Sequence, residues 1–200
     1  MVWPAPVTLT SPHVRLEPLS PSHHDALCEA TRDGELWQLW YTSVPAPEGM
    51  AAEIQRRLAL QATASMLPFT VFDMSAQGQG RVVGMTTYMH IDATHRRVEI
   101  GSTWTARSAQ RTPLNTAAKR LLLAHAFEQL ECIAVEFRTH RLNTQSRRAI
   151  ERLGAQLDGV LRAHQRTADG SQRDTAVYSI TAAEWPAVRS HLDWLMNKSR

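Results

Sequence analysis

Hydrophobic and polar positions repeat along the chain with two different periods. Alternation of apolar and polar residues, as at Val14 and Leu16 against Arg15 and Glu17, is typical of a half-buried strand. Such stretches predict strands over residues 7–19, 69–74, 81–90, 96–105, 132–139, 159–168 and 173–180. Apolar residues at helical spacing, together with capping residues, predict helices over residues 25–31, 47–64, 114–130, 143–153 and 184–196.

Turn and capping residues set several of these boundaries. Ser20 followed by Pro21 is a typical helix start, because the serine side chain can cap the first turn. Gly154 is a typical left-handed stop for the helix before it, and Asp169-Gly170 predicts a tight turn between the last two strands. In the fifth predicted strand we expect one face to carry Ile133, Val135 and Phe137.

The order of these elements predicts the fold class. It is strand, two helices, three strands, helix, strand, helix and two strands, which favours an α+β fold with one mixed sheet. A helix connects the predicted strands 96–105 and 132–139, and such a crossover indicates that the two strands are parallel neighbours.

Composition and charge narrow the function classes. The chain has 200 residues, 43% of them hydrophobic and 20% charged, as expected for one soluble globular domain. The net charge of +3 comes without a basic stripe, so nucleic-acid binding is not favoured, whereas a polyanionic cofactor would fit. The nine histidines lack metal-ligand spacing, and we expect no metal.

The cysteines and the hydropathy pattern bear on the compartment. Cys28 and Cys132 are far apart and form no Cys-x-x-Cys pair, which favours a reducing compartment. The N-terminal residues lack the pattern of a signal peptide, and no apolar run is long enough for a membrane span. We therefore expect a cytoplasmic protein without a membrane partner.

The segment between the fourth predicted strand and the following helix is a candidate anion site. Thr112 suits the N-cap, and Pro113 then falls at the first helical position, where its missing N–H costs nothing. Free amides at such a helix end bind anions, and a pyrophosphate is a natural guest between Arg107 and Arg111. The amides concerned are those of Leu114, Asn115 and Thr116. The alternative is an ordinary capped helix with solvated arginines.

A second segment, Asn143-Thr144-Gln145-Ser146, opens the next helix. Asn143 suits the N-cap, and Ser146 lies at the third helical position. Taken alone, this segment is simply a helix start.

Together, these segments resemble the GNAT superfamily of acetyltransferases, specifically the branch of ribosomal-protein N-terminal acetyltransferases of the RimJ/RimL type. The resemblance is close in the second half of the chain, and in the first half it reaches Arg15–Leu19 and the order of elements. The motifs are Val98-Glu99-Ile100-Gly101, Gln110–Thr116, His125-Ala126-Phe127, Asn143-x-x-Ser146-x-x-Ala149-Ile150, Leu153-Gly154-Ala155 and Gly159-Val160-Leu161-Arg162. One departure is Pro113, where the family's cofactor loop usually has a glycine, since proline removes an amide donor.

The resemblance implies a single GNAT-like α+β domain over residues 1–200. Its mixed, mostly antiparallel sheet would have helices on both faces and would splay between strands 96–105 and 132–139. Residues 7–105 would form the N-terminal strands and acceptor-side helices, residues 106–183 the cofactor-binding half, and residues 184–200 a helical tail. Acetyl-CoA would lie in the splay, and an amine would attack its thioester directly in a ternary complex.

The resemblance also implies roles for individual residues. Glu99 would be the base, acting through water, although an ion pair with Arg97 or another arginine is the alternative. It lies on the strand so as to point the same way as Gly101 and Thr103. Ser146 would be the acid, with helix capping as its alternative. The expected cofactor contacts are Gly101, Ser102, Thr103, Gln110, Arg111, Thr112, Leu114, Asn115, Thr116, Asn143 and Ser146.

The acceptor side is less defined by the sequence. Trp37, Trp40 and Tyr41 could line an acceptor site, since aromatic walls suit cationic or peptidic amines, or they could be core or dimer contacts. The acceptor is either a protein N-terminus or a small amine, and the tail could support a homodimer. Two rival functions stay open: an inactive acetyl-CoA-binding module, motivated by Pro113, and a nucleic-acid-binding protein, motivated by the basic pI of about 9.2.

Overall fold

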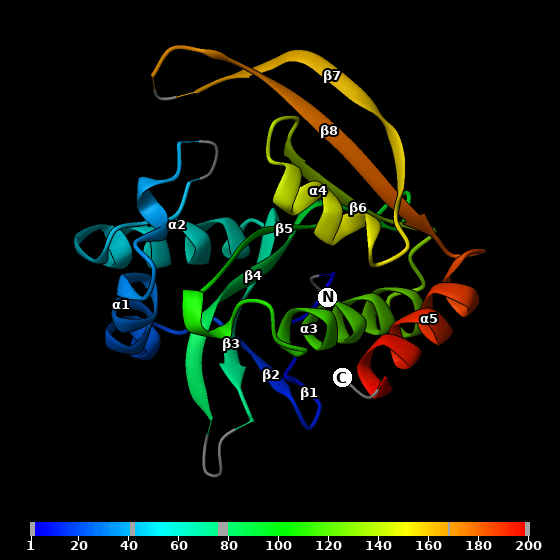
Figure 1. Cartoon of the computed structure of the whole chain (residues 1–200), viewed down its shortest axis with the longest axis horizontal. Helices are drawn as coiled ribbons and strands as arrows, with labels where there is room; N and C mark the ends of the chain where they lie inside the picture. Colours follow the sequence, from blue (N-terminus) through cyan, green and yellow to red (C-terminus); the bar gives the residue numbers. More distant parts are fainter. Residues whose placement is uncertain (1–2, 41–42, 76–79, 168, 199–200) are drawn as a thin grey trace.

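The computed structural model describes residues 3–40, 43–75, 80–167 and 169–198. Within these ranges the strands form one open sheet (Figure 1), in the order β1-β2-β3-β4-β5-β6-β8-β7. The strands are β1 (Leu9–Thr10), β2 (Val14–Pro18), β3 (Met66–Asp73), β4 (Arg81–Asp92), β5 (Arg97–Thr105), β6 (Ala134–His140), β7 (Gln156–Arg166) and β8 (Gln172–Thr181). The α-helices are α1 (His24–Arg32), α2 (Met50–Ala62), α3 (Leu114–Ala124), α4 (Thr144–Glu151) and α5 (Trp185–Asn197).

The sheet opens between its two parallel strands. All neighbouring strands are antiparallel except β5 and β6, so the predicted parallel pair is confirmed. Their pairing runs only from Arg97 opposite Ala134 to Glu99 opposite Glu136. Beyond Glu99 the two strands diverge, which confirms the predicted splay and leaves one edge of β5 without a strand partner.

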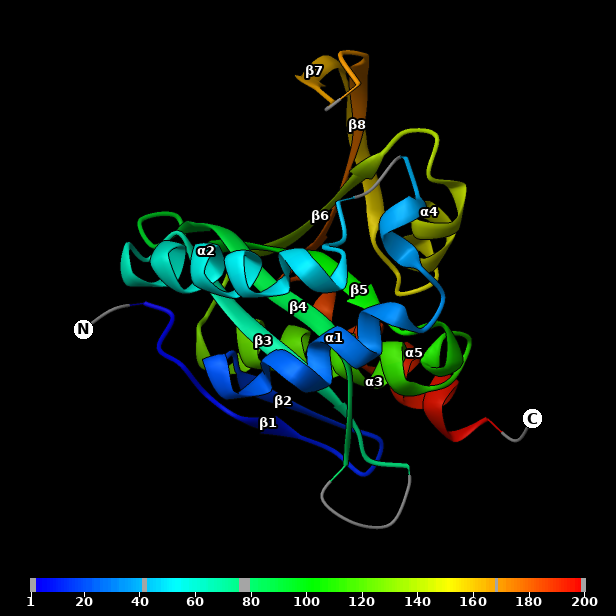
Figure 2. The same cartoon turned by 90° about the vertical axis from the view of Figure 1, so that its left-hand side faces the viewer.

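Two consecutive threonines of β4 show that helices cover both faces of the sheet. Thr87 Oγ1 accepts a hydrogen bond from Arg57 of α2 at 2.6 Å, and Thr86 Oγ1 accepts one from Lys119 of α3 at 3.1 Å. Because successive strand residues point to opposite faces, α2 and α3 lie on opposite sides of β4 (Figure 2). The predicted α+β fold with helices on both faces is confirmed.

Local sequence signals act as predicted at several element ends. Val14 and Leu16 are fully buried, as their alternation predicts. The Ser20 side chain accepts a hydrogen bond from the Ser22 amide at the first short helix. Gly154 and Gly170 have φ of +99° and +82°, in the left-handed region that glycine adopts without strain.

Three sequence predictions are wrong in detail. Residues 7–19 form two strands, because a turn that contains Pro12 reverses the chain and β1 and β2 pair as an antiparallel hairpin. The helix predicted over 114–130 is α-helical only to Ala124 and continues as a π-helical turn over His125–Gln129. Ile133 precedes β6, and its side chain is 55% exposed instead of sharing a buried face.

Two further features concern the outside of the molecule. The hairpin of β7 and β8 extends beyond the rest of the molecule (Figure 1), with β7 as the edge strand. The helix α5 packs on α3, where Arg120 Nε lies 2.9 Å from Asp193 Oδ1. Among the described residues, no helix combines the length and the apolar character that crossing a membrane requires.

Candidate functional site

The divergence of β5 and β6 opens a cleft that consists of two adjoining cavities. The first cavity has a volume of about 560 Å³ and lies toward the N-terminal ends of α3 and α4. The second cavity, of about 270 Å³, lies toward Glu99 and the start of β8. Both are lined by Val44, Thr103, Trp104, Asn143 and Ser146. The two cavities therefore form one continuous cleft.

The first cavity receives the N-terminus of α3. Thr112 Oγ1 accepts a hydrogen bond from the Leu114 amide at 3.3 Å, and the helix begins at Leu114, the first residue of the predicted range. No hydrogen bond from the described part of the chain reaches the amides of Asn115 and Thr116. A helix end with free amides is an anion site. Pro113 adopts helical φ and ψ of −62° and −18°, so its ring fits this helix start.

The N-terminus of α4 borders the same cavity. Asn143 Oδ1 accepts a hydrogen bond from the Ser146 amide at 3.0 Å, so Asn143 is the cap of this helix. Its amide nitrogen forms no hydrogen bond with a described residue. The hydroxyl of Ser146 lines both cavities and forms no hydrogen bond with a described residue. The alternative that Ser146 is itself the capping side chain therefore does not hold.

The remaining predicted cofactor contacts divide into two groups. Gln110, Arg111 and Thr112 line the first cavity with Thr103 and Asn115, and Ser102 lines the second. The side chains of Leu114 and Thr116 are buried, and neither they nor Gly101 lines either cavity. Arg148 of α4 and Arg152, the residue after this helix, were not found from the sequence and add positive charge to the first cavity.

A β-bulge shapes the wall of the cleft. Thr87 pairs with Gly101 but Met85 pairs with Trp104, so β5 contains one extra residue here, and Ser102 has φ of +45°. The bulge reverses the side-chain alternation beyond it. Thr103 consequently points to the α3 face, where its Oγ1 accepts a hydrogen bond from Lys119 at 2.8 Å.

Glu99 therefore does not share a direction with Thr103, contrary to the prediction. It does share one with Gly101, because a Cβ atom at Gly101 would lie 2.6 Å from Glu99 Oε1. Any larger residue at this position would displace the Glu99 carboxylate.

Two buried cations hold the bulge from opposite faces of the sheet. Arg57 of α2 donates to the Ser102 carbonyl, and Lys119 of α3 donates to the Thr103 hydroxyl. Both side chains are nearly inaccessible, at 1% and 6% exposure. Burial lowers the pKa of Lys119 to about 7, since no carboxylate compensates its charge.

Glu99 is buried at 4% exposure and is held by two basic side chains. Its Oε2 lies 2.7 Å from His90 Nδ1 and 3.4 Å from Arg138 Nε. The predicted alternative, an ion pair of Glu99 with Arg97 or another arginine, is realised with Arg138, whereas Arg97 pairs with Glu136. The hydrogen bond to Glu99 raises the pKa of His90, against the opposing effect of burial. His90 lines the second cavity and was not found from the sequence.

A second histidine, His140, lines the same cavity. Its Nδ1 accepts the Leu142 amide at 3.0 Å, so the neutral ring carries its proton on Nε2. Burial, followed by the charges of Arg173 and Arg141, lowers the pKa of His140.

Neither of the two predicted tryptophans, Trp37 and Trp40, is part of the lining of the two cavities. Trp40 is 60% exposed and packs edge-on against the His140 ring, with 5.2 Å between the ring centroids. Trp37 lines neither cavity, and Tyr41 lies outside the described residues. The segment nevertheless contributes a wall, through Leu36, Leu39 and Val44.

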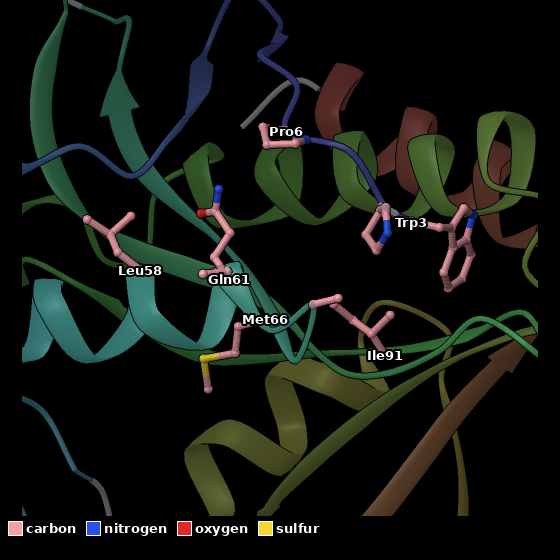
Figure 3. A pocket seen from close by; sticks show the side chains of 9 residues that line it. Trp3, Pro6, Leu58, Gln61, Met66 and Ile91 are labelled. Atoms are coloured by element: carbon pink, nitrogen blue, oxygen red, sulfur yellow. The ribbon is translucent and has the colours of Figure 1, made fainter. Parts of the chain in front are cut away.

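A separate cavity of about 250 Å³ lies between the N-terminal segment, α2 and β4 (Figure 3). Its lining residues are Trp3, Pro4, Pro6, Leu58, Gln61, Ala62, Ala64, Met66 and Ile91. None of these side chains titrates, so this cavity offers no acid–base chemistry. Within the described ranges, no group of three or more His, Cys, Asp and Glu residues could hold a metal ion.

Comparisons with known proteins agree with this geometry. The family described as Acetyltransferase (GNAT) domain matches residues 13–156. A protein of Bacillus subtilis (strain 168), named provisionally as the ribosomal N-acetyltransferase YdaF, is 33% identical over 106 residues, which are 53% of this chain. That match spans only 57% of the Bacillus protein.

Solved structures resemble nearly the whole chain. A GCN5-related N-acetyltransferase from Brucella melitensis is 30% identical with a TM-score of 0.83, over 96% of this chain and 86% of that one. Mycobacterium smegmatis RimJ, solved in complex with CoA-disulfide, has a TM-score of 0.78 at 23% identity, over 96% and 95% of the two chains. The likeness to RimJ concerns the fold.

Proposed function

Because the chain belongs to the GNAT acetyltransferase family, as its sequence predicted, we propose that it transfers the acetyl group of acetyl-CoA to a primary amine. The observation that carries the proposal is the cleft between β5 and β6. One of its cavities ends at two helix N-termini with arginines, and the other contains the titratable groups His90, Glu99 and His140. This division suits a polyanionic coenzyme on one side and an amine on the other.

The first cavity is the proposed coenzyme site. The amides of Asn115 and Thr116, with Arg111 beside them, would bind the pyrophosphate. The free main-chain edge of β5 beyond Glu99 and the side-chain amide of Asn143 would bind the pantetheine. When bound, acetyl-CoA supplies the thioester carbonyl that the amine attacks.

Proton transfer is assigned to His90, Glu99 and Ser146. His90 donates from Nδ1 to Glu99, which leaves its Nε2 able to accept the amine proton, directly or through water. Glu99 then acts by fixing the tautomer of His90 and by stabilising its charge, as a carboxylate does in a catalytic triad. The Ser146 hydroxyl would give its proton to the departing thiolate.

The reaction forms a C–N bond and breaks the thioester C–S bond. Main-chain N–H groups at the bulge are the proposed donors for the tetrahedral oxyanion. Arg57 and Lys119, which hold the bulge from either side, would keep this wall in place. The products are an N-acetyl amide and free coenzyme A.

The proposed acceptor is a protein N-terminus. The name of the Bacillus relative supports this choice over a small amine. A cytoplasmic location suits such a substrate. The predicted homodimer and the single domain over residues 1–200 stay predictions.

The test is calorimetric titration with acetyl-CoA, followed by a thiol-release assay with peptide amines, on wild type and on Pro113→Gly. We expect micromolar binding and thiol release by the wild-type protein. Binding that appears only in Pro113→Gly would favour the inactive module and overturn the proposed activity. Tight, steeply salt-dependent RNA binding without acetyl transfer would favour the nucleic-acid function.

A further inference from the structure

The second cavity contains an arginine that forms no ion pair with any residue that the structure describes. Arg173 of β8 lines this cavity, and its half-buried side chain forms no hydrogen bond or ion pair with any described residue. Its Nε is buried and unpartnered. Burial lowers the pKa of Arg173, while the nearby charge of Glu99 opposes that effect. Desolvating a guanidinium nitrogen without an acceptor is unfavourable, so this arrangement calls for an explanation.

The other charges of the cavity do not compensate Arg173. Among the described residues, Glu99 is the only carboxylate that lines the second cavity, and it is already bound to His90 and Arg138. Gln165 of β7 lies directly across the hairpin from Arg173 and lines the cavity as well, adding an uncharged amide. The described lining therefore carries more positive than negative charge. Gln165 and Arg173 of the β7–β8 hairpin add hydrogen-bond donors to it.

Two arginines near Arg173 differ from it because each has an ionic partner. Arg162 Nε, on the hairpin, lies 2.9 Å from Asp174 Oδ2, and Arg141 Nε, in the loop after β6, lies 3.3 Å from the same oxygen. These two are surface ion pairs, and neither residue lines the cleft. Arg173 alone combines a place in the cavity with the lack of an internal partner, among the arginines that the structure describes on β7 and β8.

We propose that Arg173 binds a carboxylate of the acceptor, so that the preferred substrates carry an acidic group close to the amine. This inference rests on the proposed function and names its substrate class. A planar guanidinium suits a carboxylate because it can donate two parallel hydrogen bonds. The carboxylate would be the side chain of an N-terminal aspartate or glutamate, or the α-carboxylate of a free amino acid.

The phosphates of the coenzyme are a poorer match for Arg173. Arg111, Arg148 and Arg152 line the first cavity with the free helix amides, at the other end of the cleft. Arg173 instead shares the second cavity with His90 and Glu99, the groups assigned to the amine proton. A group bound by Arg173 would therefore belong to the molecule that carries the amine.

The test compares acceptors that differ only in charge. A peptide that begins with Asp is compared with one that begins with Asn, and a peptide that begins with Glu with one that begins with Gln. In the same way, free alanine is compared with alaninamide. With the acidic peptides we expect kcat/KM to be about 10- to 100-fold higher than with their amides, the range for a hydrogen bond to a charged group. A preference confined to alanine over alaninamide would assign the carboxylate to a free amino acid.

Variants of Arg173 then test whether this residue causes the preference for acidic acceptors. Arg173→Met should bring the ratio close to one by slowing the acidic acceptor only, and Arg173→Lys should keep part of it. The affinity for acetyl-CoA, measured by calorimetry, should not change, and thermal melting confirms that the variants fold. Arg166→Met, which removes an exposed charge of the same hairpin outside the cavity, is the matched control and should keep the full ratio.

A failure of this inference and a failure of the proposed function give different results. Equal kcat/KM for acidic and neutral acceptors, or a preference that survives in Arg173→Met, would overturn this inference while the proposed acetyltransferase activity stands. An absence of transfer to every acceptor, charged or neutral, would remove the proposed function, and the assignment of Arg173 with it.

Discussion

The guanidinium of Arg57 donates two hydrogen bonds to the main-chain carbonyl of Ser102, over 3.3 and 3.2 Å. It thereby ties α2 to the bulge of β5. Its Nε also lies 2.7 Å from Glu53 Oε1, in an ion pair whose arginine side chain is 2% exposed. Helix, bulge and cleft wall are thus joined through a single side chain.

Arg57→Met should cost about 3–5 kcal/mol of stability, because it removes one partner of a buried ion pair. It should also raise the KM for acetyl-CoA, since the bulge loses its support. Urea denaturation and steady-state kinetics measure the two effects. Arg56→Met is the matched control: Arg56 binds the same Glu53, but its side chain is 50% exposed, and its loss should cost less than about 1 kcal/mol. Equal losses for both variants would contradict the structural role of Arg57.

Lys119 should make the stability depend on pH. Its folded pKa of about 7 lies below its ordinary value of 10.5, so between these values the folded state binds fewer protons than the unfolded state. Stability should therefore rise with pH from about 7 to 10.5, and the full penalty of burial should be present below pH 7.

Lys119→Met should remove that rise and stabilise the protein at pH 6 by roughly 2–4 kcal/mol. The hydroxyls of Thr86 and Thr103 remain bonded to each other at 2.8 Å, which limits the loss of polar partners. Urea denaturation at several pH values gives the slope. A variant that keeps the wild-type slope would show that Lys119 is not the group responsible.

The residues that support the bulge could have been found from the sequence, but only as charged residues that interrupt the apolar face of a helix. Arg57 lies three residues after Ile54 and seven after Met50, on the same predicted apolar face of its helix. Lys119 lies three residues before Leu122, which is fully buried. A charged residue on an apolar stripe indicates a buried partner. By contrast, nothing in Gly101-Ser102-Thr103 predicts a bulge. A bulge arises from the register of β5 against β4, and the sequence of β5 alone does not contain that register.

The fold and the capped helix ends at the first cavity followed from patterns that are local in the chain. Caps such as Asn143 and Thr112 act on amides two or three residues away, so their spacing predicts them. His90 and Arg173 come from strands on either side of the cleft and meet Glu99 only through the sheet order. The periodicity of one sequence does not show which strand residues lie opposite one another, so His90 and Arg173 were missed.

Asn143 has two separable roles. Its Oδ1 caps α4, and its amide nitrogen is the proposed donor to the pantetheine. Asn143→Ala should lose about 1 kcal/mol of stability along with coenzyme affinity, whereas Asn143→Asp should keep the cap and lose only affinity. We expect calorimetry to show binding weaker by about 5- to 10-fold in both. Wild-type affinity in Asn143→Asp would exclude the amide as a coenzyme donor.

The pairing of Glu99 with His90 predicts how the rate depends on pH. Because His90 acts as a base when neutral, kcat/KM should rise through the pKa of His90, which the hydrogen bond to Glu99 holds above its ordinary value of 6.5. In Glu99→Gln this support is lost, while burial and the charge of Arg138 still lower the pKa, with only Glu136 opposing them.

The midpoint should then shift to lower pH, and the plateau rate should fall because the imidazolium is less stabilised. The acceptor amine titrates identically in both proteins, so the difference between the two profiles reports on the enzyme. His95→Asn is the control. His95 lies between β4 and β5, its ring is 69% exposed, and it lines neither cavity. The pH profile of this variant should match that of the wild type. A Glu99→Gln profile that falls in height without moving its midpoint would mean that His90 is not the titrating base, and that Glu99 must take the proton without it.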